Sequence, residues 1–298
     1  MARSRFLKRW LPRLWFVRRA TRRFMPGETV EEALDAAEAF RPLGIGVLFT
    51  HLGENLTDLA DAQAVADHYA DLLDKIGARG LDAEISAKPT QLGLDLDREA
   101  TLAHLTRLAR RAAEMDRLLW LDMEGSAYTD ATLDLYRSLK ETQPNIGICL
   151  QAYLRRTPAD VHALLPLRPA IRLVKGAYAE PAAIAFRRKD EVNAAYQSLC
   201  VLMLPYAGRG ELRLGLGTHD TALIERVAEY ATGAGIGKDA FEVEMLYGIR
   251  SDQQRRLAAE GYRVLTLIAY GEAWYPWYMR RLAERPANVW FAMRQIFG

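Results

Sequence analysis

Two cations lie close together in an apolar run near the middle of the chain, at residues 171–178. The run is apolar up to Val174 and then reads Lys-Gly-Ala-Tyr, which predicts a buried strand that ends in a tight turn. Arg172 lies inside this predicted strand and Lys175 at its end, while Gly176 allows a close approach to the backbone. Such a strand end is suited to an anionic cofactor.

Two further groups carry chemistry of the same kind. The tetrad Gly217-Thr-His-Asp220 follows a second apolar run, and the pair Arg280-Arg281 lies in a helical pattern near the C-terminus. A pair of arginines forms a planar, permanently charged clamp that suits a carboxylate. The three groups together favour a flavoenzyme.

The elements that must position these residues repeat along the chain after Gly27. Short apolar runs cover residues 45–49, 83–86, 118–121, 146–150, 170–174, 212–216, 241–245 and 264–268. Helical patterns between them cover residues 60–76, 98–113, 131–140, 160–165, 190–204, 221–231 and 251–260. Eight strands alternating with helices predict a (β/α)8 barrel with parallel strands. We expect one catalytic barrel domain over residues 27–298.

The predicted strands end in a set of residues that is mostly polar or charged, with Gly53, Met123 and Gly271 among them. They are His51, Gly53, Glu54, Lys88, Gln91, Asp122, Met123, Glu124, Gln151, Lys175, Tyr178, Thr218, His219, Asp220, Glu244, Tyr270 and Gly271. Barrel enzymes build their active sites at the C-terminal ends of their strands. Any one of these residues could be an ordinary loop residue, but the whole set predicts an active site at this rim.

Residues 1–26 form a predicted basic, amphipathic helical extension. The first 23 residues carry nine Lys or Arg and no acid, so the net charge of +2 becomes −7 without them. The segment is too charged to span a bilayer and lacks the uninterrupted apolar core of a secretory signal. Two interpretations stay open: a segment lying on an anionic membrane surface, or a helix packed on the barrel. No nucleic-acid partner is expected.

The cysteines and histidines predict neither a disulfide framework nor a metal site. Cys149 and Cys200 lie in apolar patterns and are interpreted as small core residues. The five histidines are scattered, without the spacing of a zinc site, so we expect no metal. Two distant cysteines favour a reducing compartment, which predicts a cytoplasmic protein, with peripheral contact with the inner face of the cell membrane as the alternative.

The chain resembles the proline dehydrogenase family, in its monofunctional bacterial branch. The matching segments are Leu52-Gly-Glu54, Lys88-Pro-Thr-Gln-Leu-Gly93, Leu121-Asp-Met-Glu124, Leu150-Gln-Ala-Tyr-Leu154, Arg172-Leu-Val-Lys-Gly-Ala-Tyr178, Thr218-His-Asp220, Phe241-Glu-Val-Glu-Met-Leu-Tyr-Gly248 and the stretch from Trp274 to Asn288. Their order and spacing match as well as their composition, over almost the whole chain. No Gly-x-Gly-x-x-Gly fingerprint follows a strand, so barrel loops would have to hold a flavin.

The resemblance implies a distorted (β/α)8 barrel with FAD across its C-terminal mouth. It implies oxidation of L-proline to pyrroline-5-carboxylate, with the electrons passed to a membrane quinone. It assigns catalysis to Asp122 and Arg172, and it implies that Glu54 acts as a gate at the mouth. Substrate binding falls to Lys88, Leu267, Trp277, Arg280 and Arg281. Cofactor binding falls to Met123, Gln151, Arg172, Lys175, Gly176, Ala177, Thr218, His219 and Glu244.

Three positions depart from the family's usual pattern. Leu267 and Trp277 stand where tyrosines are usual, and Glu244 stands where glutamine is usual. The first two changes make the substrate pocket less polar, and Glu244 brings a carboxylate close to the expected flavin, which makes the flavin harder to reduce unless Glu244 is protonated or paired. Two alternatives therefore remain. One is a related flavoenzyme acting on 4-hydroxyproline or another cyclic secondary amino acid, and the other is a barrel that binds flavin or proline without turnover.

Overall fold

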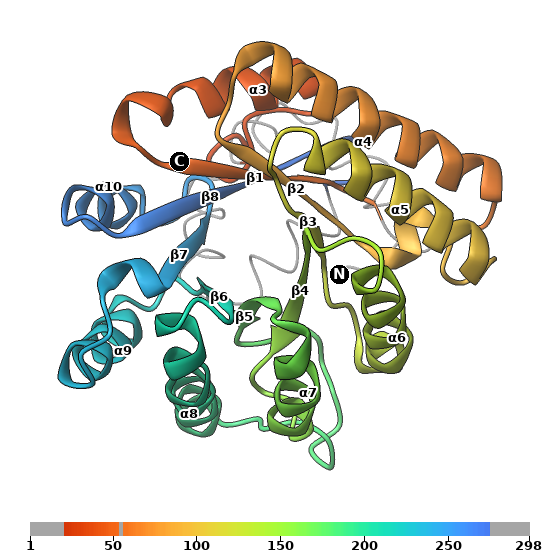
Figure 1. The fold of residues 1–298 in the computed structure, drawn as a ribbon. Coiled ribbons are helices and arrows are strands. Elements are labelled where there is room, and N and C mark those ends of the chain that lie inside the picture. The colour runs from red at the N-terminus through yellow and green to blue at the C-terminus, as the bar shows by residue number, and fades with distance from the viewer. Residues whose placement is uncertain (1–20, 54–55, 275–298) are drawn as a thin grey trace, which may run out of the picture.

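Eight parallel strands close into a barrel in the order β1 to β8 (Figure 1). The computed structural model describes residues 21–53 and 56–274. The strands are β1 Gly46–His51, β2 Ala83–Ala87, β3 Leu119–Leu121, β4 Ile146–Gln151, β5 Ala170–Val174, β6 Arg213–Gly217, β7 Phe241–Leu246 and β8 Arg263–Tyr270. Pairing of β8 with β1 closes the barrel, with Leu267 opposite Leu48. The predicted (β/α)8 barrel is confirmed.

Helices ring the barrel on the outside (Figure 1). They are α3 Val30–Glu38, α4 Leu59–Arg79, α5 Arg98–Ala113, α6 Thr129–Lys140, α7 Thr157–Leu164, α8 Lys189–Gly208, α9 Thr221–Gly233 and α10 Ser251–Ala259. Short 3-10 helices lie at Arg41–Leu43, Pro89–Leu92, Ser126–Tyr128, Leu165–Leu167 and Lys238–Ala240. Within the described part of the chain, no helix is both long and apolar enough to cross a membrane.

Local sequence signals explain where several helices begin and end. Asp58, Asp97 and Asp220 each cap a helix N-terminus, and the side chain of each accepts a backbone N–H from the first turn. Gly80 ends α4 with φ at 58°, a left-handed conformation that glycine adopts without strain. Because these signals are local, the predicted helices match the observed ones closely, and α5 has the bounds predicted for it.

Side chains of each strand alternate between the helix layer and the barrel interior. Outward-facing Phe49 shares one large buried core with Leu72 of α4. Leu48 lies instead with Trp120, Ala170 and Leu265 in a separate buried cluster inside the barrel. We call this cluster the lumen plug. Both predicted core cysteines are confirmed as buried and free.

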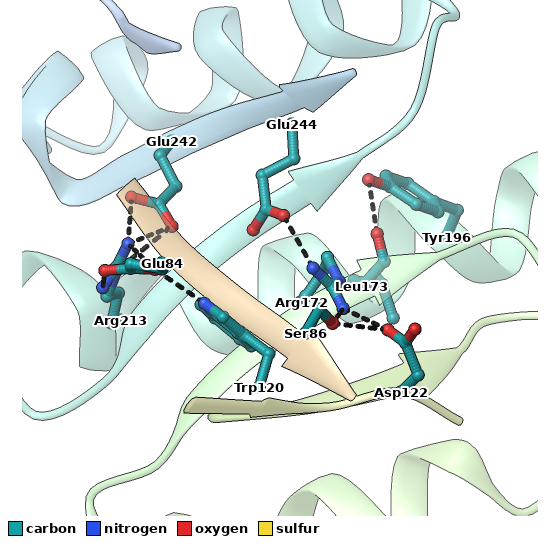
Figure 2. Close-up of polar contacts among 10 residues, drawn as sticks. All are labelled: Glu84, Ser86, Trp120, Asp122, Arg172, Leu173, Tyr196, Arg213, Glu242 and Glu244. Atoms are coloured by element: carbon teal, nitrogen blue, oxygen red, sulfur yellow. Dashed lines mark hydrogen bonds and ion pairs between the residues drawn. The ribbon is translucent and has the colours of Figure 1, made fainter. Parts of the chain in front are cut away.

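A charged cluster lies beside Trp120 of the lumen plug, toward the N-terminal ends of the strands (Figure 2). Arg213 of β6 donates to Glu84 of β2 at 2.7 Å and to Glu242 of β7 at 3.0 Å. The indole N–H of Trp120 donates to Glu84 at 2.7 Å. Every strong hydrogen-bonding group here has a partner, which is the condition for burying charge. We call Glu84, Arg213 and Glu242 the floor cluster.

We expect the lumen plug to be intolerant of added volume at Gly147. A Cβ atom built there would lie 2.4 Å from the Trp120 ring, so Gly147→Ala must displace a buried indole. Overpacking of this kind costs about 1–3 kcal/mol of unfolding free energy. Gly233, at the end of α9, has open space at its Cβ position and provides the matched control Gly233→Ala. Urea denaturation of both variants tests this, and equal midpoints would contradict it.

Candidate active site

The centre of the candidate site is the guanidinium of Arg172, which points from β5 into the barrel (Figure 2). Its Nη2 atom lies 2.5 Å from Oδ1 of Asp122 and 2.7 Å from Oγ of Ser86. Its Nη1 atom lies 3.3 Å from Oε2 of Glu244. The Arg172 side chain is 4% exposed and that of Asp122 is 18% exposed, so residues on or next to four strands form a largely buried charged network.

Asp122 is the better-bonded carboxylate of this network. It follows β3, and its backbone N–H donates to the carbonyl of Ala87. Ser86 Oγ donates to its Oδ1 at 2.7 Å, and Lys88 Nζ lies 3.8 Å from its Oδ2. Burial by itself would raise the pKa of Asp122, but Arg172 and Lys88 outweigh burial and hold that pKa below its usual range. Asp122 is therefore ionised at neutral pH.

Glu244 is the poorly bonded carboxylate. It is 4% exposed, and its Oε1 atom is buried without a hydrogen-bond partner among the described residues. Gly215 makes room for it, since a Cβ there would come within 2.1 Å of that oxygen. Burial raises the pKa of Glu244 to about 7, although the charge of Arg172 opposes the shift. The same burial thus leaves one carboxylate ionised and the other titrating near neutrality.

Helix α4 fixes the serine that both Arg172 and Asp122 contact. The Tyr69 hydroxyl donates to the carbonyl of Ser86 at 3.0 Å and accepts the backbone N–H of His51 at 2.9 Å. Tyr69 is fully buried, so this link between α4, β1 and β2 is shielded from competing water. The network is therefore positioned from outside the barrel as well as from within.

Gln151 and Met123 lie together at the mouth. Gln151 ends β4, and its Nε2 donates to the backbone carbonyls of Glu124 at 3.1 Å and Met123 at 3.4 Å. Its Oε1 atom is buried and has no hydrogen-bond partner in the described part of the chain. A buried acceptor of this kind is costly unless a bound group supplies a donor. The side chain fits a ligand that presents an N–H to the mouth.

The turn after β5 brings a cation and a close backbone approach together. Lys175 Nζ donates to Asp220 at 2.8 Å and to Asn193 at 2.7 Å. Gly176 has φ at 114°, and the ring of Tyr153 occupies the space where its Cβ would lie. Ala177 follows directly. The charge of Lys175 is thus held at the end of β5 by the N-cap residue of α9.

The remaining described candidates lie on β6, β7 and β8. The Thr218 hydroxyl accepts the backbone N–H of Asp220 at 3.2 Å, and His219 Nε2 accepts the backbone N–H of Leu246 at 2.9 Å. His219 therefore ties the end of β6 to the end of β7. Leu267 packs against the lumen plug from inside the barrel and is partly exposed.

Four predicted site residues lie outside the described residues: Glu54, Trp277, Arg280 and Arg281. The same holds for residues 1–20 of the predicted basic extension. Among the described residues, no group of three or more His, Cys, Asp and Glu could hold a metal ion.

Sequence reasoning missed Ser86 and the floor cluster. A signal was present in residues 83–88, where Glu84, Ser86 and Lys88 alternate with apolar residues. A period of two places all three on one face of a strand, and in a barrel that face is the interior. A buried parallel strand is expected to be apolar throughout, so strand propensity alone does not predict this polar face.

Fold and site together define a class: a (β/α)8 barrel with a network of buried ion pairs at the C-terminal mouth, where such barrels carry their chemistry. The model of the family described as proline dehydrogenase matches residues 33–294. This chain belongs to the proline dehydrogenase family.

Individual relatives agree with this assignment. The chain is 36% identical to proline dehydrogenase 1 of Bacillus subtilis strain 168, over 94% of this chain and 91% of the relative. It is 38% identical to the proline dehydrogenase of Deinococcus radiodurans, over 91% and 88%. The crystal structure of proline utilization A from Bdellovibrio bacteriovorus, inactivated by N-propargylglycine, superimposes with a TM-score of 0.82 at 24% identity. It covers 90% of this chain but 33% of that longer chain, so this likeness shows the shared fold.

We expect Glu244→Gln to remove a pH dependence of stability. The folded pKa of about 7 lies above the ordinary value of 4.5, so the folded state binds a proton that the unfolded state has lost. Wild-type stability therefore falls as pH rises from 4.5 to 7, by up to about 3 kcal/mol, and the glutamine variant lacks this fall. Denaturation between pH 4.5 and 8 measures the difference. The exposed Glu229 supplies the control Glu229→Gln, and parallel pH profiles of Glu244→Gln and wild type would contradict the assignment.

Proposed function

We propose that this chain is an FAD-dependent proline dehydrogenase that oxidises L-proline to pyrroline-5-carboxylate and passes the electrons to a membrane quinone. Family membership supports proline as the substrate. The observation that carries the chemistry is the buried contact of Arg172 with Asp122 at the mouth, beside Lys88. These residues provide fixed positive charge and an ionised carboxylate where a zwitterionic substrate and an electron acceptor would meet.

The residues at the mouth fit the cofactor. The unpartnered Oε1 of Gln151 can accept an N–H from the edge of a flavin ring, and Met123 flanks it. Lys175, Gly176 and Ala177 would line the cofactor along the turn after β5, and Thr218 and His219 would hold its chain after β6. When bound, FAD supplies the acceptor for a hydride from the proline ring carbon next to nitrogen. The protein's own residues bind and orient the substrate and the cofactor.

The protein's part is orientation and charge. Arg172 keeps its charge at every physiological pH, because the carboxylates of Glu244 and Asp122 outweigh the cost of burial and raise the pKa of its guanidinium. A fixed positive charge stabilises negative charge that develops beside it during the reaction. Asp122 lies between Arg172 and Lys88 and so orients both cations. Lys88 then faces the substrate carboxylate, together with the pair Arg280-Arg281.

A second candidate substrate follows from Leu267. Its side chain belongs to the interior of the barrel, beside the apolar lumen plug, and it offers no hydrogen bond to a ligand. An apolar wall cannot strongly reject an added hydroxyl, because such pockets discriminate by only about 1–3 kcal/mol. This favours tolerance of 4-hydroxyproline or of alkyl-substituted prolines.

The basic segment 1–23 would supply peripheral contact with the membrane that holds the quinone.

We expect the purified protein to be yellow and to lose its flavin absorbance when L-proline is added without oxygen. The flavin should be released by acid as FAD, since no covalent link is expected. Absorbance spectra before and after proline, with D-proline as the control, test both statements. A colourless protein that FAD does not reconstitute would refute the flavoenzyme, and a yellow protein unchanged by proline would favour binding without turnover.

We expect Leu267→Tyr to narrow the enzyme toward L-proline. The tyrosine ring and hydroxyl would occupy space beside the lumen plug that Leu267 leaves apolar and partly open. The preference for L-proline over trans-4-hydroxy-L-proline, measured as the ratio of kcat/KM values, should rise about tenfold or more. Leu267→Met, which conserves volume and polarity, is the matched control. An unchanged ratio in the tyrosine variant would mean that Trp277 or a loop shapes the pocket.

A further inference from the structure

Glu244 is the buried ionisable group that the proposed mechanism leaves without a task. Its Oε2 atom lies 3.3 Å from Arg172 Nη1, which is a longer and weaker contact than the 2.5 Å one that Arg172 makes with Asp122. Its Oε1 atom has no hydrogen-bond partner among the described residues and faces the bare backbone of Gly215. A buried carboxylate with one free oxygen is the natural place for a proton, because protonation removes the cost of burying its charge.

The two carboxylates that share Arg172 are not equivalent. Asp122 has three partners, namely Arg172, Ser86 and Lys88. Among the described residues, Glu244 makes an ion pair with Arg172 alone, and burial raises its pKa to about 7. When one cation serves two buried carboxylates, the less well-bonded one takes the proton.

Charged groups face Glu244 from several strands of the barrel. They are Arg172 on β5, Arg213 on β6, Glu242 on β7 and Glu84 on β2. The two glutamates of this set are bound by Arg213 within the floor cluster. The charges of these groups therefore all affect the pKa of Glu244, but Arg172 is the one group in this set with which it makes an ion pair.

The lumen plug borders both Glu244 and the floor cluster. Trp120 is fully buried and lies against both arginines, with its ring 5.1 Å from the guanidinium carbon of Arg172 and 5.4 Å from that of Arg213. Leu265, next to Glu244 in the barrel register, is 2% exposed. These apolar neighbours make the ionised form of Glu244 costly to bury.

We propose that Glu244 takes up a proton when the bound cofactor accepts two electrons, and releases it when those electrons leave. This inference rests on the proposed function. The neutral proline amine loses a hydride to the cofactor and a proton to solvent, which leaves one added negative charge beside Arg172. Protonation of the Glu244 carboxylate compensates that charge. Two electrons and a proton then pass from the cofactor to the quinone, which takes its second proton from solvent, and Glu244 returns its own proton to solvent.

The experiment counts protons. Holoenzyme is reduced photochemically without oxygen at pH 7.5, so the result does not depend on proline, and proton uptake is followed with an indicator dye. We expect wild type to take up more protons per two electrons than Glu244→Gln, by up to one. Over pH 7–8 the midpoint potential of wild type should fall more steeply than that of the variant. One extra proton per two electrons steepens this fall by at most about 30 mV per pH unit. For a two-electron couple that is a tenfold change in the equilibrium constant per pH unit. Glu229→Gln, an exposed control, should match wild type.

A second measurement uses wild type alone, so it stands even if the variant folds poorly. Infrared difference spectra between oxidised and reduced holoenzyme should show a protonated-carboxyl band that appears on reduction and shifts when glutamate is labelled with carbon-13. A merely structural role for Glu244 would produce neither the band nor the proton difference.

The outcomes distinguish the proposed proton role of Glu244 from the proposed function of the protein as a proline dehydrogenase. Equal proton uptake in wild type and Glu244→Gln, with no labelled band, overturns the role of Glu244 while a flavin bleached by proline still supports the dehydrogenase. A protein that binds no flavin overturns both. Extra uptake with a labelled band supports the proton role even if the substrate proves to be a substituted proline.

Discussion

The burial of one guanidinium is the constraint on which the rest of this structure depends. Taking an arginine side chain out of water costs several kcal/mol unless its donors are matched by acceptors of the right charge and geometry. Arg172 meets this requirement with Asp122, Ser86 and Glu244, which come from different strands. The barrel must therefore hold β2, β3, β5 and β7 in one register. Gly215 is part of the same requirement, because any side chain there would displace Glu244.

The barrel interior is divided into layers by chemistry. The floor cluster is a set of ion pairs, joined by Arg263 through Glu242, at the N-terminal ends of the strands, where barrels carry stability rather than activity. The lumen plug lies above it and excludes water. The Arg172 network lies at the mouth, with the oxygens of Gln151 and Glu244 that have no hydrogen-bond partner among the described residues. Trp120 of the plug contacts both Arg172 and Arg213, so the plug links the floor cluster to the Arg172 network.

Two carboxylates within reach of one cation have opposite properties because their surroundings differ. Asp122 stays ionised and orients the cations around it, while Glu244 titrates near neutrality. Glutamine, which the family resemblance leads one to expect at position 244, would keep the shape of the side chain but could not change its charge. The glutamate therefore places a group that titrates near neutrality beside Arg172. Leu267 changes the pocket in a separate way, by removing a polar group from its wall, so charge and shape of the site vary independently.

The sequence by itself determined the barrel, its strands and helices within a few residues, and the rim at which polar residues collect. These follow from patterns that each segment carries alone: periods of 2 and 3.6, helix caps such as Asp97, and polar residues at strand ends. Only the tertiary structure decided which of those residues meet. Arg172 contacts Ser86 across 86 residues of chain and Glu244 across 72, and closure of the barrel alone brings them together. The difference in pKa between Asp122 and Glu244 was likewise beyond the sequence, because it depends on how many partners each buried carboxylate finds.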